Sequence, residues 1–129
     1  MGVALLQKTF IASGAIGKNL IVKCVTGGSL SAGLMVALAA ANNVPLIGVN
    51  ELKAAADGEQ VDVTINGIAE VICGSAVAIG DWVTADSAGK AVPVGSTGGT
   101  NYQTIGRALL AGSTGDIIPV HLSNQTLQG

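Results

Sequence analysis

The sequence has few aromatic and few charged residues. Phe10, Trp82 and Tyr102 are its aromatic residues, and charged residues make up 11% of the chain. The six basic residues are not clustered, whereas a nucleic-acid-binding surface needs a basic stripe that displaces counterions from phosphates. We therefore expect no nucleic-acid partner, and the shortage of aromatic rings disfavours a site that stacks sugars.

Long apolar runs are also missing. The longest run, residues 34–41, is far short of the ~20 residues that a membrane-spanning helix needs. The chain has no Lys/Arg-rich amphipathic face, and its first residues lack the basic segment and apolar core of a secretory signal. We therefore expect no membrane association. We also expect that the protein is synthesised in a cytoplasm.

Cysteine is scarce, and Cys24 and Cys73 admit at most one intramolecular disulfide. For a chain without an export signal, two buried free thiols that act as small hydrophobic side chains are the preferred interpretation. Neither cysteine has a second Cys or a His at ligand spacing, so no zinc site is predicted.

The sequence shows no recognisable catalytic constellation. His121 is the only histidine, and it alternates with apolar neighbours, which places it on the strand face opposite the core. The acidic residues between positions 51 and 62 do not have the spacing of a calcium loop. The glycine-rich stretches 14–19 and 95–100 lack the phosphate-binding loop pattern. We predict a non-enzymatic protein with no cofactor and no metal.

Glycine and small aliphatic residues are what the chain has in abundance, with 19 glycines and 49% apolar residues. This composition indicates a mainly β protein, and 129 residues are enough for one domain with a real core. Residues 60–65 alternate polar and apolar, as a strand with one buried face does. Asn66-Gly67 lies between this run and residues 68–72, which predicts a hairpin with a type I′ turn.

A second hairpin is predicted at residues 81–85 and 90–94. The connecting residues Asp86 to Gly89 suit a turn, because Asp bonds to the following backbone and Gly adopts left-handed conformations. Pro119 lacks a donor, so the strand that contains it should lie at an edge or a bulge. Residues 95–101 are predicted to form an exposed loop. Further strands are predicted at residues 19–25, 103–109 and 117–122.

The chain also repeats itself, at an offset close to 58 residues with one insertion or deletion. Residues 30–36 match 77–83 in the placing of Gly and Val, and residues 47–52 match 105–110. Each copy then reaches a turn and a strand. Two similar half-domains packed about a pseudo-twofold axis would follow, and chance similarity in an Ala/Gly/Val-rich chain is the alternative.

Two segments have helical character. Residues 29–42 are Ala-rich with a Ser cap, but their counterpart in the second copy contains a turn. We therefore expect strand, turn and strand there, with a helix as the alternative. A short helix is expected near residues 51–56.

The N-terminal residues 1–18 form either an arm or the first strand, ahead of a single β-rich domain at 19–129. An extended arm can add a strand to a partner's sheet edge. The candidate partner-binding side chains in this segment are Val3, Leu5, Leu6, Phe10 and Ile11. Trp82 either anchors an oligomer interface, since aromatic residues dominate interface energetics, or fills the core.

Short motifs of glycines, turn residues and alternating valines run through the second half of the chain. They are GIAEV at 67–71, GSAVAIGDWVT at 74–84, GKAVP at 89–93, IGRAL at 105–109 and GDIIPV at 115–120. Residues 45–49 and 61–63 fit the same pattern. With these motifs the sequence resembles the capsid cement (decoration) protein family of tailed bacteriophages.

The resemblance implies a β-clip or β-tulip fold, that is, a small barrel or sandwich with hairpins. It also implies a homotrimer on the capsid exterior of the virion, with no catalytic residues to carry over. The implied function is to bind the major capsid protein and stabilise joints between capsomers. Two other functions stay open: a β-clip-type binding module for carbohydrate or an enzyme, and an oligomeric scaffold protein.

Overall fold

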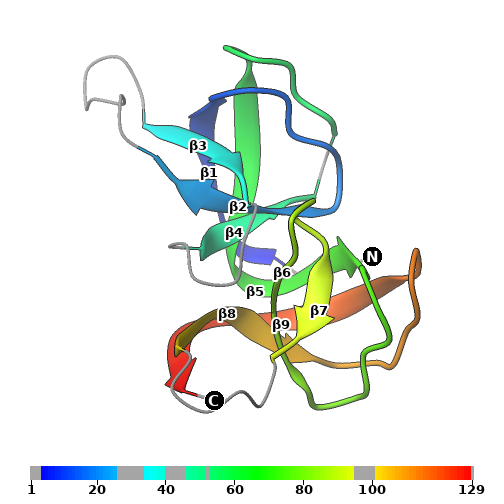
Figure 1. Cartoon of the computed structure of the whole chain (residues 1–129). Helices are drawn as coiled ribbons and strands as arrows, with labels where there is room; N and C mark the ends of the chain where they lie inside the picture. The colour runs from blue at the N-terminus through cyan, green and yellow to red at the C-terminus, as the bar shows by residue number, and fades with distance from the viewer. Residues whose placement is uncertain (1–3, 26–33, 40–45, 52, 95–100, 129) are drawn as a thin grey trace.

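The computed structural model describes residues 4–25, 34–39, 46–51, 53–94 and 101–128, of which residues 4–8, 101–102 and 124–128 are described by their backbone only. These ranges contain nine strands and no helix, which confirms the predicted mainly β fold (Figure 1). No membrane-spanning helix is therefore found in them. The strands are β1 (Ala4–Ala12), β2 (Leu20–Cys24), β3 (Met35–Leu38), β4 (Leu46–Asn50), β5 (Gln60–Ile72), β6 (Trp82–Ala85), β7 (Ala91–Pro93), β8 (Asn101–Ala108) and β9 (Ile117–Gln128).

The first five strands close into a barrel, here called the first barrel. Its strand order is β1-β3-β2-β4-β5, and β5 pairs back with β1. Only the β1–β3 contact is parallel. The buried side chains inside are Phe10, Ala12, Ile16, Val22, Val36, Ala55, Val61 and Val63.

The remaining strands form a second barrel that shares β5 with the first. Its order is β5-β9-β8-β6-β7, and a single parallel bridge between Cys73 and Ala91 joins β7 back to the end of β5. Each strand of the first barrel therefore has a counterpart in the second: β1 corresponds to the end of β5, β2 to β6, β3 to β7, β4 to β8 and β5 to β9.

The strand registers support the predicted duplication. Gly48 corresponds to Gly106, and a Cβ on either would lie within 2.3 Å of a carbonyl oxygen of the neighbouring strand, on Thr64 or His121. This confirms the match for the described residues 47–51 with 105–109, and residue 52 lies outside the described residues. The match of residues 30–36 with 77–83 is wrong, because β3 corresponds to β7 and not to β6.

The same turn precedes β2, β5, β6 and β9. In each, an isolated bridge residue leads to a turn whose last residue has positive φ, and the strand follows. The bridges pair Ile16 with Ala55 in the first barrel and Val77 with Gly112 in the second. The left-handed residues are Asn19, Gly58, Gly80 and Gly115.

The hairpin predicted at Asn66-Gly67 is wrong, because β5 runs through both residues without turning back. A type I′ turn needs positive φ at both central residues, and of the two only Gly67 has it, at 95°. The first part of β5 pairs with β1 and β4, and its second part pairs with β9. The two parts of β5 can pair with these neighbouring strands only if β5 continues through residues 66 and 67.

Other predicted elements are confirmed. β6 and β7 form the second hairpin, and Oδ1 of Asp86 accepts hydrogen bonds from the N–H groups of Ala88 and Lys90 at 2.8 and 2.9 Å. Strands also occur where predicted at β2, β8 and β9. The short helix near residues 51–56 is not present in the described part of that segment, where Ala55 bridges to Ile16 instead.

Pro119 does not lie on an edge strand, because β9 is flanked by β5 and β8. The carbonyl of Pro119 accepts from Leu109, just past the last pair of the β8–β9 ladder, Ala108 with Val120. Both polar groups of an extended residue face the same side, so the nitrogen of Pro119 also faces Leu109 and cannot donate the return hydrogen bond. The pair of Leu109 with Pro119 therefore has one backbone hydrogen bond.

In the Ala-rich segment 29–42 the described residues contain β3, a strand rather than a helix. The rest of that segment, apart from residues 34 and 39, lies outside the described residues, as do residues 95–100 of the predicted loop.

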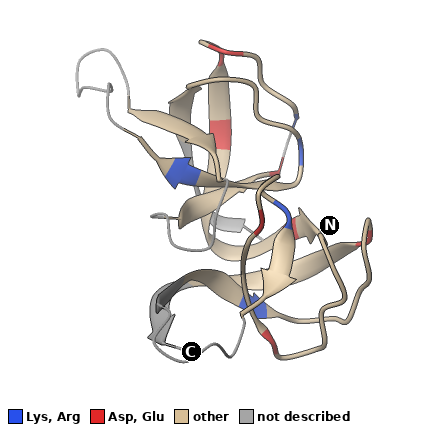
Figure 2. Ribbon diagram, in the orientation of Figure 1, with Lys and Arg blue, Asp and Glu red and all other residues tan. Residues whose placement is uncertain are grey.

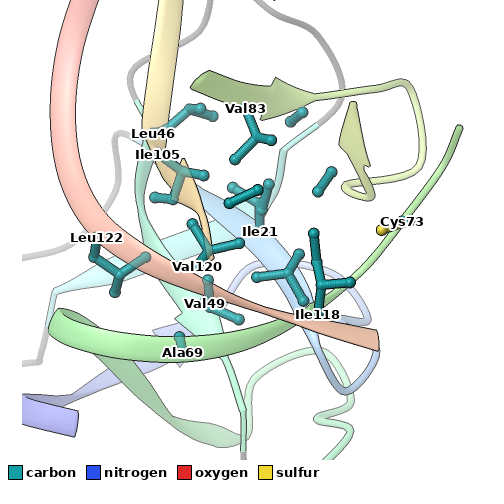
Figure 3. Packing of buried hydrophobic residues seen from close by; sticks show 14 of the residues in the cluster. Ile21, Leu46, Val49, Ala69, Cys73, Val83, Ile105, Ile118, Val120 and Leu122 are labelled. Carbon is teal, nitrogen blue, oxygen red and sulfur yellow. The ribbon is translucent and has the colours of Figure 1, made fainter. Parts of the chain in front are cut away.

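The larger core joins the two halves (Figure 3). Ile21, Leu46 and Val49 of the first half pack in one cluster with residues of the second half, among them Ile105 and Leu122. The two halves are therefore one hydrophobic unit rather than two linked modules.

Candidate functional site

The described residues contain few groups that could bind a metal ion or form a charged site. They contain no group of three or more His, Cys, Asp or Glu that could hold a metal ion. His121 is exposed between the buried Val120 and Leu122, as predicted. The few charged residues are scattered over the ribbon rather than gathered in a field of one sign (Figure 2).

The two cysteines are free and have different environments. Cys73 is buried as predicted, and burial, with the nearby Asp116 carboxylate, raises the pKa of its thiol. Cys24 is exposed, so its predicted burial is wrong. It is the last residue of β2, after the partly buried Lys23. The thiolate is the reactive form of cysteine, and a raised pKa disfavours it. We therefore interpret the buried Cys73 as a packing residue.

One end of the second barrel is apolar and exposed. The side chains involved, here called the apolar end, are Ile79, Leu109, Leu110 and Ile117, with exposed fractions of 68, 38, 55 and 53%. Backbone hydrogen bonds hold their segments side by side. Gly80 donates to Ala108 at 2.8 Å, and Leu109 donates to Pro119 at 2.9 Å. Clusters of exposed large apolar residues mark interaction sites.

The first barrel provides an internal comparison for the apolar end. At the positions that correspond to Ile79 and Ile117 it carries Lys18 and Gln60, both exposed. The turns before β2 and β5 match those before β6 and β9, and the side chains at these two positions differ. The apolar character of Ile79 and Ile117 is thus not a requirement of the fold.

Trp82 is half-buried at the start of β6. The guanidinium carbon of Arg107 lies 4.7 Å from the centre of its ring, a cation–π distance. Asp81, Trp82, Pro93 and Val94 line a shallow hollow of about 320 Å³. The side chain is neither a fully buried core residue nor a free surface residue.

The predicted arm residues lie in or near β1, which is a strand of the first barrel in this structure. Phe10 is buried in the barrel core, which argues against contact of its side chain with a partner, and Ile11 is half-buried. Leu5 and Leu6 are described by their backbone only, and Val3 lies outside the described residues. A partner-binding role for this segment stays a prediction.

A family model decides the classification: the model described as phage cement protein matches residues 14–122. The chain belongs to the phage cement protein family. The match covers β2 to β8 and the first half of β9, and it leaves out β1. The family is one of structural phage proteins, as the sequence resemblance predicted.

Among solved structures, the cement chain is similar to the N base of the head fiber gp8.5 in bacteriophage phi29. The TM-score is 0.69 with 22% sequence identity, and the alignment covers 96% of this chain and 98% of that one. At this identity the likeness establishes the fold. No curated protein matches the chain.

Sequence reasoning did not find the apolar end, although all its residues are visible in the sequence. An exposed Ile79 and a buried Ile105 are the same residue type, and only the folded positions separate them. The comparison of Ile79 with Lys18 at the equivalent turn was the usable signal, but it required the correct alignment of the two halves.

Proposed function

We propose that this protein decorates the exterior of a tailed-phage head as a homotrimer, binds the major capsid protein and stabilises joints between capsomers. The observation that carries the proposal is the family match over residues 14–122. The phi29 head-fibre base with the same fold is a second protein of a phage head. The virion is accordingly the proposed location, with synthesis in the host cytoplasm.

The apolar end is the proposed capsid-contact surface. Burying one large aliphatic side chain contributes about 1.5–3 kcal/mol at most. A handful of partly exposed side chains therefore gives a single copy only weak affinity for a shell. Copies held together bind with an avidity larger by roughly 10²–10⁴. Subunits of the shell held by one trimer must release it together in order to separate.

A pelleting assay with purified phage heads that lack the decoration protein tests this surface. Ile79→Asp places a charge in the apolar end and should weaken binding to heads at least tenfold. Lys18→Asp is the matched control, because it changes the exposed, equivalent position of the first barrel. Equal binding by the Ile79→Asp variant and the unmodified protein would exclude the apolar end as the contact.

A further inference from the structure

The joint between the two halves is an inserted segment. In the first barrel the N–H of Ile11 donates directly to the carbonyl of Leu34 at 2.7 Å. The equivalent groups in the second barrel are the N–H of Ile72 and the carbonyl of Gly89. The N–H of Ile72 donates to the carbonyl of Asn19 at 3.0 Å, and the carbonyl of Gly89 accepts from Ile21 at 2.8 Å. Residues 19–21 are thus wedged into an opened seam.

This joint is not a pseudo-twofold contact, so that prediction is wrong. A twofold axis would also place the equivalent of Asn19, which is Gly80, against Ile11. Ile11 bonds to Leu34 instead. One surface of the first half meets a different surface of the second, which is a head-to-tail contact. Such a contact leaves one unused copy of each surface.

The unused inserting segment is Gly80 to Trp82. Its equivalence to residues 19–21 follows from two pairs of hydrogen bonds. Asn19 donates to Asn50 at 2.6 Å, as Gly80 does to Ala108 at 2.8 Å. Ala39 donates to Ile21 at 2.9 Å, as Val94 does to Trp82 at 2.9 Å. In the described part of the chain no residue takes the place of Ile72 and Gly89 beside this second segment.

The hollow beside Trp82 is the unused seat of a turn. Gly89, in the second half, packs against Leu38 of the first half. A Cβ on the glycine would lie 2.5 Å from Cδ1 of the leucine. Pro93 corresponds to Leu38. Trp82, Pro93 and Val94 line the hollow. At the equivalent position of the first half, beside Leu38, the turn that contains Gly89 of the second half is packed.

The unused receiving surface lies on the first barrel. Ile105 and Leu122, at the joint, are exposed by 0 and 5%. Their first-barrel counterparts, Ile47 and Ile65, are only partly buried. The side chains at these two positions are therefore buried in the second half and partly exposed in the first half.

We propose that two copies of this chain associate head to tail through these unused surfaces. The Gly80–Trp82 segment of one copy enters the Ile11–Leu34 seam of the next. The N–H of Ile11 leaves the carbonyl of Leu34 and donates to the carbonyl of Gly80, and the N–H of Trp82 donates to the carbonyl of Leu34. One hydrogen bond is exchanged for two. A repeated head-to-tail contact closes into a ring when its rotation allows. The contact rests on the proposed function in that it would hold the homotrimer together, and because it needs no capsid, its test is separate from that of binding to heads.

Light scattering after size exclusion tests the contact on the intact protein. The unmodified protein at about 50 µM should run as a closed oligomer. Val94→Asp puts a charge in the hollow and should weaken association at least tenfold, with an unchanged β-sheet circular dichroism spectrum. Ile79→Asp is the control on the neighbouring surface and should keep the oligomer. A monomeric unmodified protein, or an oligomer untouched by Val94→Asp, overturns the proposal.

Cysteine pairs give a second test that does not depend on the stability of a variant. In a Cys24→Ser background, Leu34→Cys with Pro93→Cys places the two thiols at the intermolecular equivalents of Gly89 and Leu38. Mild oxidation should then give covalent oligomers on a denaturing gel. Leu34→Cys with Ile79→Cys should not, because Ile79 is the counterpart of Lys18, which stays exposed beside the joint. Equal cross-linking of both pairs, or none of the first, contradicts the contact.

Discussion

Replacing Ile21 with alanine should destabilise both barrels at once. Ile21 lies on β2 of the first half, its side chain is 0% exposed, and it packs in the cluster that contains the interior of the second barrel. Truncation of a buried Ile to Ala costs about 2–5 kcal/mol, because the transfer free energy is lost and a cavity remains. We take about 3 kcal/mol, a large part of the roughly 5–15 kcal/mol that stabilises a domain.

The expected shift in melting temperature follows from chain length. An unfolding entropy of about 2.1 cal/mol/K per residue gives about 0.27 kcal/mol/K for a chain of this size. A loss of about 3 kcal/mol therefore lowers Tm by about 11 °C. Ile79→Ala is the control, and because its side chain is 68% exposed it should change the free energy of unfolding by less than about 0.5 kcal/mol.

Two probes of urea unfolding decide whether the halves are coupled. Fluorescence of Trp82 reports the second barrel, and far-ultraviolet circular dichroism reports the whole chain. At matched protein concentration both midpoints should fall together in the Ile21→Ala variant. An unchanged Trp82 midpoint, with circular dichroism falling in two steps, would refute the shared core.

Three further results are expected. A thiol reagent at pH 8 should modify Cys24 quickly and the buried Cys73 only upon unfolding, as the mass of the adduct shows. Gly106→Ala should cost about 3 kcal/mol in a denaturant titration, because its Cβ would lie 2.0 Å from a backbone oxygen; a loss below about 1 kcal/mol would contradict the close approach. Deletion of residues 1–12 should abolish the cooperative thermal transition, since β1 closes the first barrel; a folded deletion variant that no longer binds heads would instead support the arm.

Local signals predicted the elements whose structure is decided locally. The turn at Asp86 to Gly89 was readable because the carboxylate and the glycine stabilise it without help from distant residues. The Asn66-Gly67 pair was misread for the opposite reason. β1 and β9, far apart in the sequence, pair with the two parts of β5, and these tertiary contacts override the turn preference.

The candidate surfaces were less predictable than the fold. The sequence makes Trp82 a candidate interface residue because it is aromatic. The structural argument for an interface is different: Ile21, at the equivalent position of the first half, is buried in the joint between the halves. Phe10, a candidate for partner contact, is a core residue because alternation along β1 turns it into the barrel. Periodicity shows which residues share a face, and only the closed barrel shows which face is inside.

Binding to phage heads is the measurement that tests the central claim most directly. Purified, undecorated heads of the phage that encodes this chain should bind it to saturation, at a fixed number of copies per head. The saturated heads should release their DNA at a higher temperature than bare heads. Heads that bind none of the protein, or that bind it and rupture at an unchanged temperature, would contradict a cement function.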